Sequence, residues 1–294
     1  MANSIYTEDP FHFAPLWDAI LSIYQEFATI CNQYDLRHYA IGGTLLGAVR
    51  HHGFIPWDDD LDIAMPRPDF EKFKSIAKDV LPKGLKLVDR RNTPEFKALY
   101  FKIQCSDAAL VMGLEKTLGR ELKHGVYIDV FPIDGYVDTY FRRVLGRVNE
   151  LFARIGMRYY FRKDYPTSWV DKIKTVVAFL TSVLKDGFLL SRDKFMQARE
   201  RYFRRWGFDD VPCSGTCGCH IDRFQMTFPE GLWSNTVMLP FGCIQMPAPG
   251  NYKKFLEINY GDYMTLPPEE KRLPTHGELF SAPWKLGPTK KDQY

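Results

Sequence analysis

The chain contains Gly42-Gly-Thr-Leu-Leu-Gly-Ala-Val-Arg50, followed closely by Trp57-Asp-Asp-Asp-Leu-Asp-Ile-Ala-Met65. The first stretch predicts a glycine turn that opens a helix over residues 44–52, and the second lies in a predicted strand within residues 54–65. Asp60 and Asp62 alternate with apolar residues, and side chains two apart on a strand point to one face. The two carboxylates are therefore expected to project together.

Neighbouring carboxylates repel each other, and each raises the pKa of the other. A divalent cation between them removes this repulsion, and magnesium is usually held by one or two carboxylates together with substrate phosphates. The segment around Asp60 and Asp62 therefore predicts a metal site for phosphate chemistry. The alternative is a solvated acidic turn, which the apolar residues between the acids disfavour.

A third acid lies in another apolar segment, residues 126–131, which predicts a strand that ends at Pro132. Asp129 stands between Ile128 and Val130, where a buried charge without a partner would be costly. We favour Asp129 as a third metal ligand. The alternative is an ion pair with a nearby cation such as Lys102.

Hydrophobic spacing predicts the elements around these acids. Helices are expected over residues 12–35, from Pro68 to about residue 80, and over residues 253–260. Short strands are expected at residues 37–41, 85–89 and 98–104.

The composition is that of a soluble globular protein, with 45% hydrophobic and 26% charged residues in a chain of 294. Residues 1–10 lack the pattern of a secretory signal. The longest apolar run, residues 175–184, lies between two lysines and is too short to cross a bilayer. We expect a cytoplasmic protein whose contact with a membrane, if any, is peripheral at the inner face.

Residues 140–206 differ in charge from the rest of the chain. They hold 16 Lys or Arg against six Asp or Glu, a net charge of +10, whereas the whole chain carries +3. This predicts a basic helical insertion between a catalytic core at 1–139 and a C-terminal region at 207–294 that packs on the core and completes the site. A solvated face is the default interpretation, and an anionic partner such as a membrane surface or a phosphate-rich acceptor is the alternative. No nucleic-acid motif is present, so nucleic acid is disfavoured.

Four residues with side chains that can bind zinc lie close together in the sequence of the C-terminal region: Cys213, Cys217, Cys219 and His220. Their C-x3-C-x-C-H spacing does not match the common zinc motifs, and the adjacent Cys219 and His220 would need a tight bend. A loop of reduced cysteines is therefore favoured over a structural Zn2+ site.

The sequence resembles the LicD family of phosphotransferases, which includes bacterial phosphocholine transferases and the fukutin-related proteins. The resemblance rests on four blocks of sequence, at residues 42–50, 53–63, 127–135 and 260–268. It implies an α+β fold with a nucleotidyltransferase-like mixed β-sheet core flanked by helices. It also implies that two acids on one strand and one on a neighbouring strand hold Mg2+ or Mn2+, which here are Asp60, Asp62 and Asp129.

The resemblance implies further roles around these ligands. The backbone amides of Gly42, Gly43 and Thr44, at the start of the helix, would face the donor phosphates, because helix N-termini favour anions. Cations that could neutralise the phosphates further are Arg50, Lys102 and Arg272. Asp58 shares strand parity with the metal ligands and is a further ligand or the base for the acceptor hydroxyl. His276 is an acid or base, with a surface imidazole as the alternative.

The implied reaction moves a phospho-alcohol unit, phosphocholine or similar, from a CDP-alcohol donor to a sugar hydroxyl, with release of CMP. The acceptor would be a glycan or lipid-linked glycan of the cell surface, as in lipopolysaccharide or teichoic acid biosynthesis. A choline group needs an aromatic cage, whose walls could be Trp57, Trp233, Tyr260 and Tyr263 unless these pack in the core. The alternatives are a nucleotidyltransferase with an NTP donor and a non-catalytic scaffold with a degenerate site.

Overall fold

The computed structural model describes residues 9–93, 96, 98–118, 125–136, 197, 200–201, 203–216 and 228–274. Its helices are α1 (Ala14–Gln33), α2 (Gly42–Arg50), α3 (Arg67–Val80), α4 (Ala108–Leu118) and α8 (Tyr252–Tyr260), with a short 3-10 helix at Glu269–Lys271. Its strands are β1 (Tyr39–Ala40), β2 (Asp62–Pro66), β3 (Leu85–Val88), β4 (Phe101–Cys105), β5 (Tyr127–Tyr136), β6 (Cys213–Thr216), β7 (Thr236–Phe241) and β8 (Ile244–Pro249).

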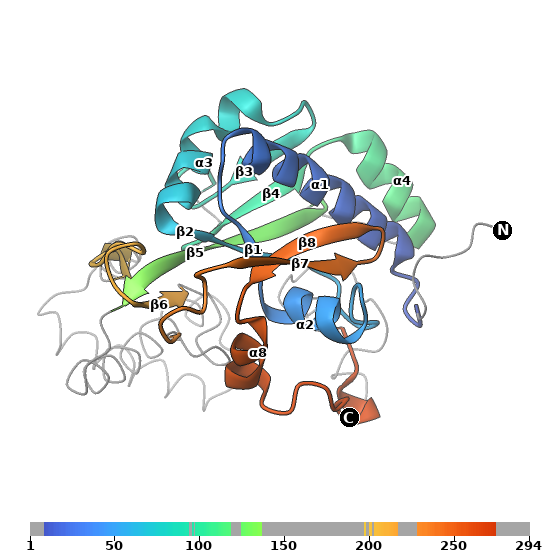
Figure 1. The fold of residues 1–294 in the computed structure, drawn as a ribbon. Helices are drawn as coiled ribbons and strands as arrows, with labels where there is room; N and C mark the ends of the chain where they lie inside the picture. Colours follow the sequence, from blue (N-terminus) through green and yellow to red (C-terminus); the bar gives the residue numbers. More distant parts are fainter. Residues whose placement is uncertain are drawn as a thin grey trace, which may run out of the picture.

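A mixed sheet forms the centre of this part of the chain (Figure 1). Its strands follow the order β1-β2-β5-β4-β3, and β6 pairs with the far end of β5. The pair β2 and β5 is parallel, whereas β1–β2, β3–β4, β4–β5 and β5–β6 are antiparallel. A mixed sheet with flanking helices confirms the expected α+β class.

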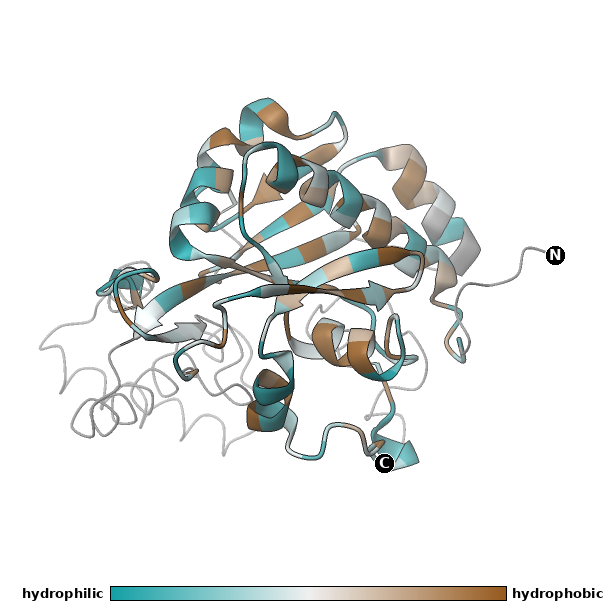
Figure 2. Cartoon of the chain, viewed as in Figure 1, coloured by the Kyte–Doolittle hydropathy of each residue, from teal (hydrophilic) through white to brown (hydrophobic). Residues whose placement is uncertain are grey.

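Helices α1, α3 and α4 lie on one side of the sheet, and α2 and α8 lie on the other (Figure 1). Helix α1 begins where the Asp9 carboxylate accepts hydrogen bonds from the backbone N–H groups of Phe13 and Ala14, at 2.6 and 2.9 Å. Phe27 of α1 contacts Phe73 of α3, which stacks on Phe101 of β4 at 5.5 Å between ring centroids. Figure 2 shows hydrophobic residues along the central strands, and alternating with hydrophilic ones along α1 and α3.

The C-terminal elements pack on α2 and on the edge of the sheet. The hairpin β7–β8 contacts α2 and β1, and α8 contacts both α2 and β8. Phe241 at the end of β7 meets Phe54 at 4.8 Å between ring centroids, and the N–H of Gly242 donates to the carbonyl of His52 at 2.6 Å. Helix α2 is therefore enclosed between the sheet and elements nearly 200 residues away in sequence.

Most predicted elements are present, but the acidic strand starts later than its alternation suggests. Strand β2 begins at Asp62, so residues 58–61 form an irregular segment ahead of it. The side-chain parity that grouped Asp58 with Asp60 and Asp62 therefore does not apply. Asp60 reaches the others through the path of this irregular segment.

The prediction that Pro132 ends its strand is wrong, because β5 continues to Tyr136. The N–H of Asp129 donates toward β2, so alternation turns the nitrogen of Pro132 to the opposite side of β5. On that side β4 pairs only as far as Val130, and β6 pairs only from Ile133. Proline lacks an N–H, and at this position no ladder hydrogen bond to a described strand is lost.

The predicted basic insertion at 140–206 lies almost entirely outside the described residues, so its helical character stays a prediction. Among the helices that the structure does describe, none combines the length and the apolar character needed to cross a bilayer.

Candidate active site

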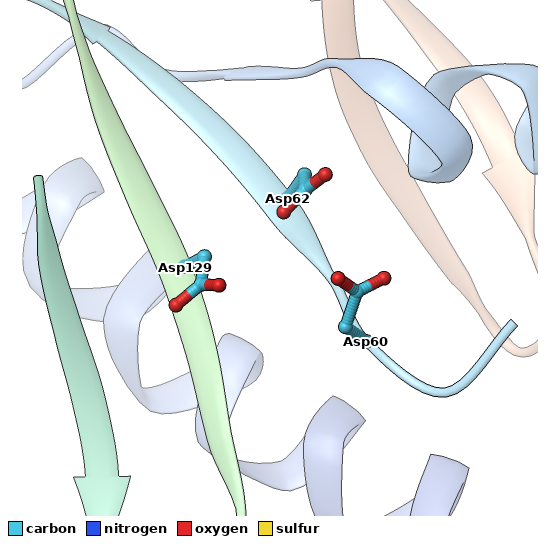
Figure 3. A group of neighbouring side chains, drawn as sticks. All are labelled: Asp60, Asp62 and Asp129. Atoms are coloured by element: carbon cyan, nitrogen blue, oxygen red, sulfur yellow. The ribbon is translucent and has the colours of Figure 1, made fainter. Parts of the chain in front are cut away.

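Strands β2 and β5 bring the three predicted ligands together. Their parallel register places Asp62 opposite Asp129, and the N–H of Asp129 donates to the carbonyl of Leu61 at 2.9 Å. One carboxylate oxygen from each of Asp60, Asp62 and Asp129 lies within 4.8 Å of the other two. Figure 3 shows Asp129 reaching from β5 toward Asp62 and Asp60. The carboxylates of β5 and of the segment that leads into β2 thus share one small volume, although β3 and β4 lie between them in sequence.

This group of carboxylates is largely withdrawn from solvent. Asp60 and Asp129 are buried, Asp62 is half-buried, and the neighbouring Asp59 is buried as well. Buried like charges are expensive unless opposite charges compensate them. The donor set consists of hard oxygen atoms, which suits Mg2+ or Mn2+ rather than a thiol-binding metal.

Lys102 supplies one compensating charge. It lies opposite Asp129 in the antiparallel register of β4 and β5, with its Nζ 2.8 Å from Oδ1 and 3.1 Å from Oδ2 of that carboxylate. The same ammonium lies 3.3 Å from the centroid of the Tyr127 ring, and Lys102 is buried. Both interpretations of Asp129 thus fit the geometry: it pairs with Lys102 and also faces Asp60 and Asp62.

Sequence reasoning missed Tyr127. Its side chain is two residues from Asp129 on β5 and therefore on the same face, which is the signal that could have identified it. Burial raises the pKa of Tyr127 well above its usual range, and the negative charges of Asp129 and Asp60 raise it further. The phenol therefore stays protonated, and its ring covers the lysine.

The glycine turn packs closely against the acidic segment. Gly42 has a φ of 57°, a left-handed conformation that suits glycine. The hydroxyl of Thr44 accepts a hydrogen bond from the N–H of Asp62 at 2.8 Å, which ties the start of α2 to the start of β2. A Cβ atom on Gly43 would lie 2.4 Å from Oδ2 of Asp58.

Asp58 is therefore placed beside the start of α2, in the region where the family resemblance implies a donor phosphate. Its backbone carbonyl accepts a hydrogen bond from Trp17 Nε1 at 2.8 Å, which fixes the segment to α1. A carboxylate is favourable at a helix N-terminus for the same reason as a phosphate. Asp58 does not belong to the close group formed by Asp60, Asp62 and Asp129.

The predicted cations divide between two places. Lys102 lies in the carboxylate group, as described above. Arg50 ends α2, at the end opposite Thr44, and its guanidinium donates to the carbonyl of Tyr263 at 3.0 Å. The Arg272 guanidinium lies 5.8 Å from the ring centroid of Trp57. The arginines thus belong to a separate cluster at the C-terminal end of α2.

The four aromatic residues considered for a choline cage are also separated. Trp233 is buried and packs against Tyr39, Phe228 and Phe255, so core packing accounts for it. Trp57 and Tyr263 are half-buried, and Tyr260 is 39% exposed. The described contacts therefore do not place all four aromatic rings around a common site.

The remaining predicted residues lie at the margin of the described structure. Cys213 begins β6, opposite Tyr136 of β5, but the position of its side chain is not described. The other residues of the cysteine cluster and the predicted acid or base lie outside the described residues: Cys217, Cys219, His220 and His276. A zinc site and a role for His276 stay predictions.

Comparison with known proteins adds evidence independent of this geometry. Residues 35–176 match the model of a family described as LicD/FKTN/FKRP, nucleotidyltransferase domain. The chain is 27% identical over 273 residues to the lipopolysaccharide cholinephosphotransferase LicD of Haemophilus influenzae, an alignment that covers 87% of this chain and 92% of the relative. It is also 32% identical over 96 residues to an uncharacterised protein of Rickettsia typhi, of which the match covers 26%.

Proposed function

Because the chain belongs to the LicD family, we propose that it is a metal-dependent phosphotransferase that decorates a cell-surface glycan. The unit transferred would be phosphocholine or a similar phospho-alcohol, taken from a CDP-linked donor and passed to a sugar hydroxyl. This proposal is supported by the similarity to a lipopolysaccharide cholinephosphotransferase over most of both chains. A nucleotidyltransferase-like arrangement of the core would suit the same chemistry.

The observation that carries the proposal is that three carboxylates, from the paired strands β2 and β5 and from the segment just ahead of β2, lie within 4.8 Å of one another. We expect Asp60, Asp62 and Asp129 to hold Mg2+ or Mn2+, since their oxygen donors and excess negative charge fit a hard divalent cation. Such a cation, when bound, neutralises phosphate charge and lowers the pKa of an attacking hydroxyl.

The residues of the chain itself would position this chemistry. Lys102 pairs with Asp129 and holds it in place, and Thr44 fixes the backbone at Asp62. The acceptor oxygen would form a bond to the phosphorus that carries the alcohol, and the bond from that phosphorus to the bridging oxygen would break. The electron pair leaves with CMP, and the hydroxyl proton passes to a base, for which Asp58 and His276 are the candidates.

The test is a product assay with the full chain, CDP-choline, Mg2+ and lipopolysaccharide as acceptor. We expect CMP to form in step with phosphocholine incorporation, and to fall to background in an Asp60→Ala, Asp62→Ala double variant. A parallel reaction with CTP would detect pyrophosphate if the protein were a nucleotidyltransferase. Full transfer activity in the double variant would contradict the assignment of the site.

A further inference from the structure

Two arginines from distant parts of the chain are linked at the C-terminal end of α2 by a row of contacts: Arg50 bonds His51, whose ring meets Trp57 edge-on at 6.1 Å between centroids, and Arg272 lies over Trp57. Arg50 is the last residue of α2; its Nε–H donates to Nε2 of His51 at 3.0 Å and its other bond goes to the Tyr263 carbonyl. Arg272 donates through Nε to the carbonyl of Pro267 at 2.8 Å. Both side chains are half-buried, and the Trp57 ring lies against Arg272.

These two guanidinium groups bond neutral acceptors. Within the described parts of the chain, neither has a carboxylate at ion-pair distance, unlike Arg37, Arg67 and Arg90, which each pair with an acid. Burial lowers the pKa of Arg50; Tyr260 acts in the opposite direction, and the positive charge of Arg272 lowers it as well. Burial and the charge of Arg50 lower the pKa of His51 to about 4, so this imidazole is neutral at pH 7.

A pair of partly desolvated guanidinium groups is the arrangement that proteins use to bind phosphate, because each offers a planar fork of N–H donors. We propose that Arg50 and Arg272, beside Trp57, form a binding subsite for a phosphate group carried by the acceptor glycan. This assignment rests on the proposed function, in which the donor diphosphate lies at the carboxylate group.

The position on α2 separates this subsite from the carboxylates. Thr44, which bonds the backbone of Asp62, and Arg50 are six residues apart on the helix, a rise of about 9 Å. The bonds from Arg50 to His51 and Tyr263 hold its guanidinium at the far end of the helix. A phosphate bound there therefore differs from one held at the carboxylates.

The two sites are nevertheless neighbours along the chain. Trp57 precedes Asp60 by three residues, a span of at most about 11 Å even when fully extended. A single acceptor could thus place a phosphate between the arginines while one of its hydroxyls reaches the carboxylate site. The subsite would select acceptors that already carry phosphate, and so would act after a sugar kinase or another phosphate-transfer step.

The first test measures binding of inorganic phosphate by calorimetry with the full chain in EDTA, where no divalent cation can bridge phosphate to the acids. We expect binding by the wild-type protein and a loss of about tenfold or more in Arg272→Gln, the size expected for removing one charged hydrogen-bonding partner. Lys271→Gln is the matched control, because Lys271 is exposed and adjacent. Arg272→Lys should regain part of the affinity, which excludes misfolding as the cause.

An Asp60→Asn, Asp62→Asn variant should bind phosphate in EDTA at least as tightly as the wild type, since it loses negative charge but keeps both arginines. Absence of phosphate binding by the wild type, or equal losses in Arg272→Gln and Lys271→Gln, would overturn the subsite. These binding results do not depend on whether the chain transfers phosphocholine.

The second test identifies the source of the phosphate. Arg272→Gln should raise KM for lipopolysaccharide about tenfold with little change in KM for CDP-choline, and the effect should vanish with lipopolysaccharide treated with phosphatase. A rise in KM for CDP-choline instead would place the donor diphosphate between the arginines and overturn the assignment to the acceptor.

Discussion

Asp62 of β2 and Asp129 of β5 lie directly opposite each other in the parallel register of the sheet, although 66 residues separate them in sequence. Neighbouring strands lie about 4.8 Å apart, so two acids in register on one face meet at the distance that a shared cation requires. The pairing of the two backbones is therefore enough to place these two carboxylates near each other, whatever rotamers their side chains adopt.

Replacing Asp129 by Asn should reduce Mn2+ affinity by at least about tenfold and transfer by about 100-fold or more, because one charged ligand is lost. Metal affinity can be measured by electron paramagnetic resonance of added Mn2+, and transfer by CMP release. Asp79→Asn, on the exposed face of α3, is the matched control and should leave both unchanged. Equal Mn2+ affinity in the wild type and Asp129→Asn would contradict the ligand assignment.

Without metal, Asp62→Asn should unfold at a temperature no lower than the wild type, since the change removes repulsion between close carboxylates. Saturating Mg2+ should stabilise the wild type but not this variant, because ligand binding stabilises only a protein that binds it. Thermal unfolding followed by circular dichroism, with and without Mg2+, measures both effects. Equal stabilisation of the two proteins by Mg2+ would show that Asp62 is not a ligand.

Lys102→Met should destabilise the metal-free protein by about 3–5 kcal/mol, because it leaves the buried Asp129 carboxylate without its ion-pair partner. Added Mg2+ should recover part of this loss by supplying another positive charge. Lys86→Met, on the exposed side of the neighbouring β3, is the control and should change stability by less than about 0.5 kcal/mol. Urea unfolding in EDTA and in Mg2+ tests the difference.

Gly47→Ala should cost about 1–3 kcal/mol, because the new Cβ would lie 2.4 Å from the backbone carbonyl oxygen of Gly53, which cannot turn away. Gly43→Ala should cost less stability, since its Cβ meets the movable carboxylate of Asp58. Gly113→Ala in α4 would place its Cβ more than 4 Å from neighbouring atoms and should stabilise by about 0.5–1 kcal/mol. Urea unfolding of the three variants should give this order.

Stability should fall as the pH is lowered from about 6.5 to 4. Burial lowers the pKa of His38 from 6.5 to about 4, so in this window the unfolded chain binds a proton that the folded protein excludes. The shift corresponds to at most about 3 kcal/mol, present above pH 6.5 and lost progressively as pH falls. Urea unfolding at pH 7 and pH 4.5 should show a smaller difference for His38→Gln than for the wild type.

Local patterns predicted the individual elements well where apolar periodicity was strong. The helix over 12–35 corresponds to α1, and the glycine turn followed by a helix corresponds to α2. The alternation of acids with apolar residues correctly indicated that the Asp60 and Asp62 carboxylates lie together, but the strand face it invoked does not include Asp60, because β2 begins only at Asp62. The prediction for Pro132 was wrong because a proline interrupts a strand only where a neighbouring strand requires a backbone N–H at that position. The sequence of one strand does not reveal whether such a neighbour is present.

The sequence by itself determined the chemistry available to this protein: a glycine turn, acids among apolar residues and a resemblance that gave them roles. Tertiary structure decided which groups act together. Lys102 meets Asp129 only through the register of β4 and β5, and Arg50 reaches Tyr263 and Arg272 reaches Trp57 only because the C-terminal region folds back along α2. Secondary structure follows from neighbours in sequence, but strand register and long-range packing are fixed by burying the whole core at once, so no local pattern specifies them.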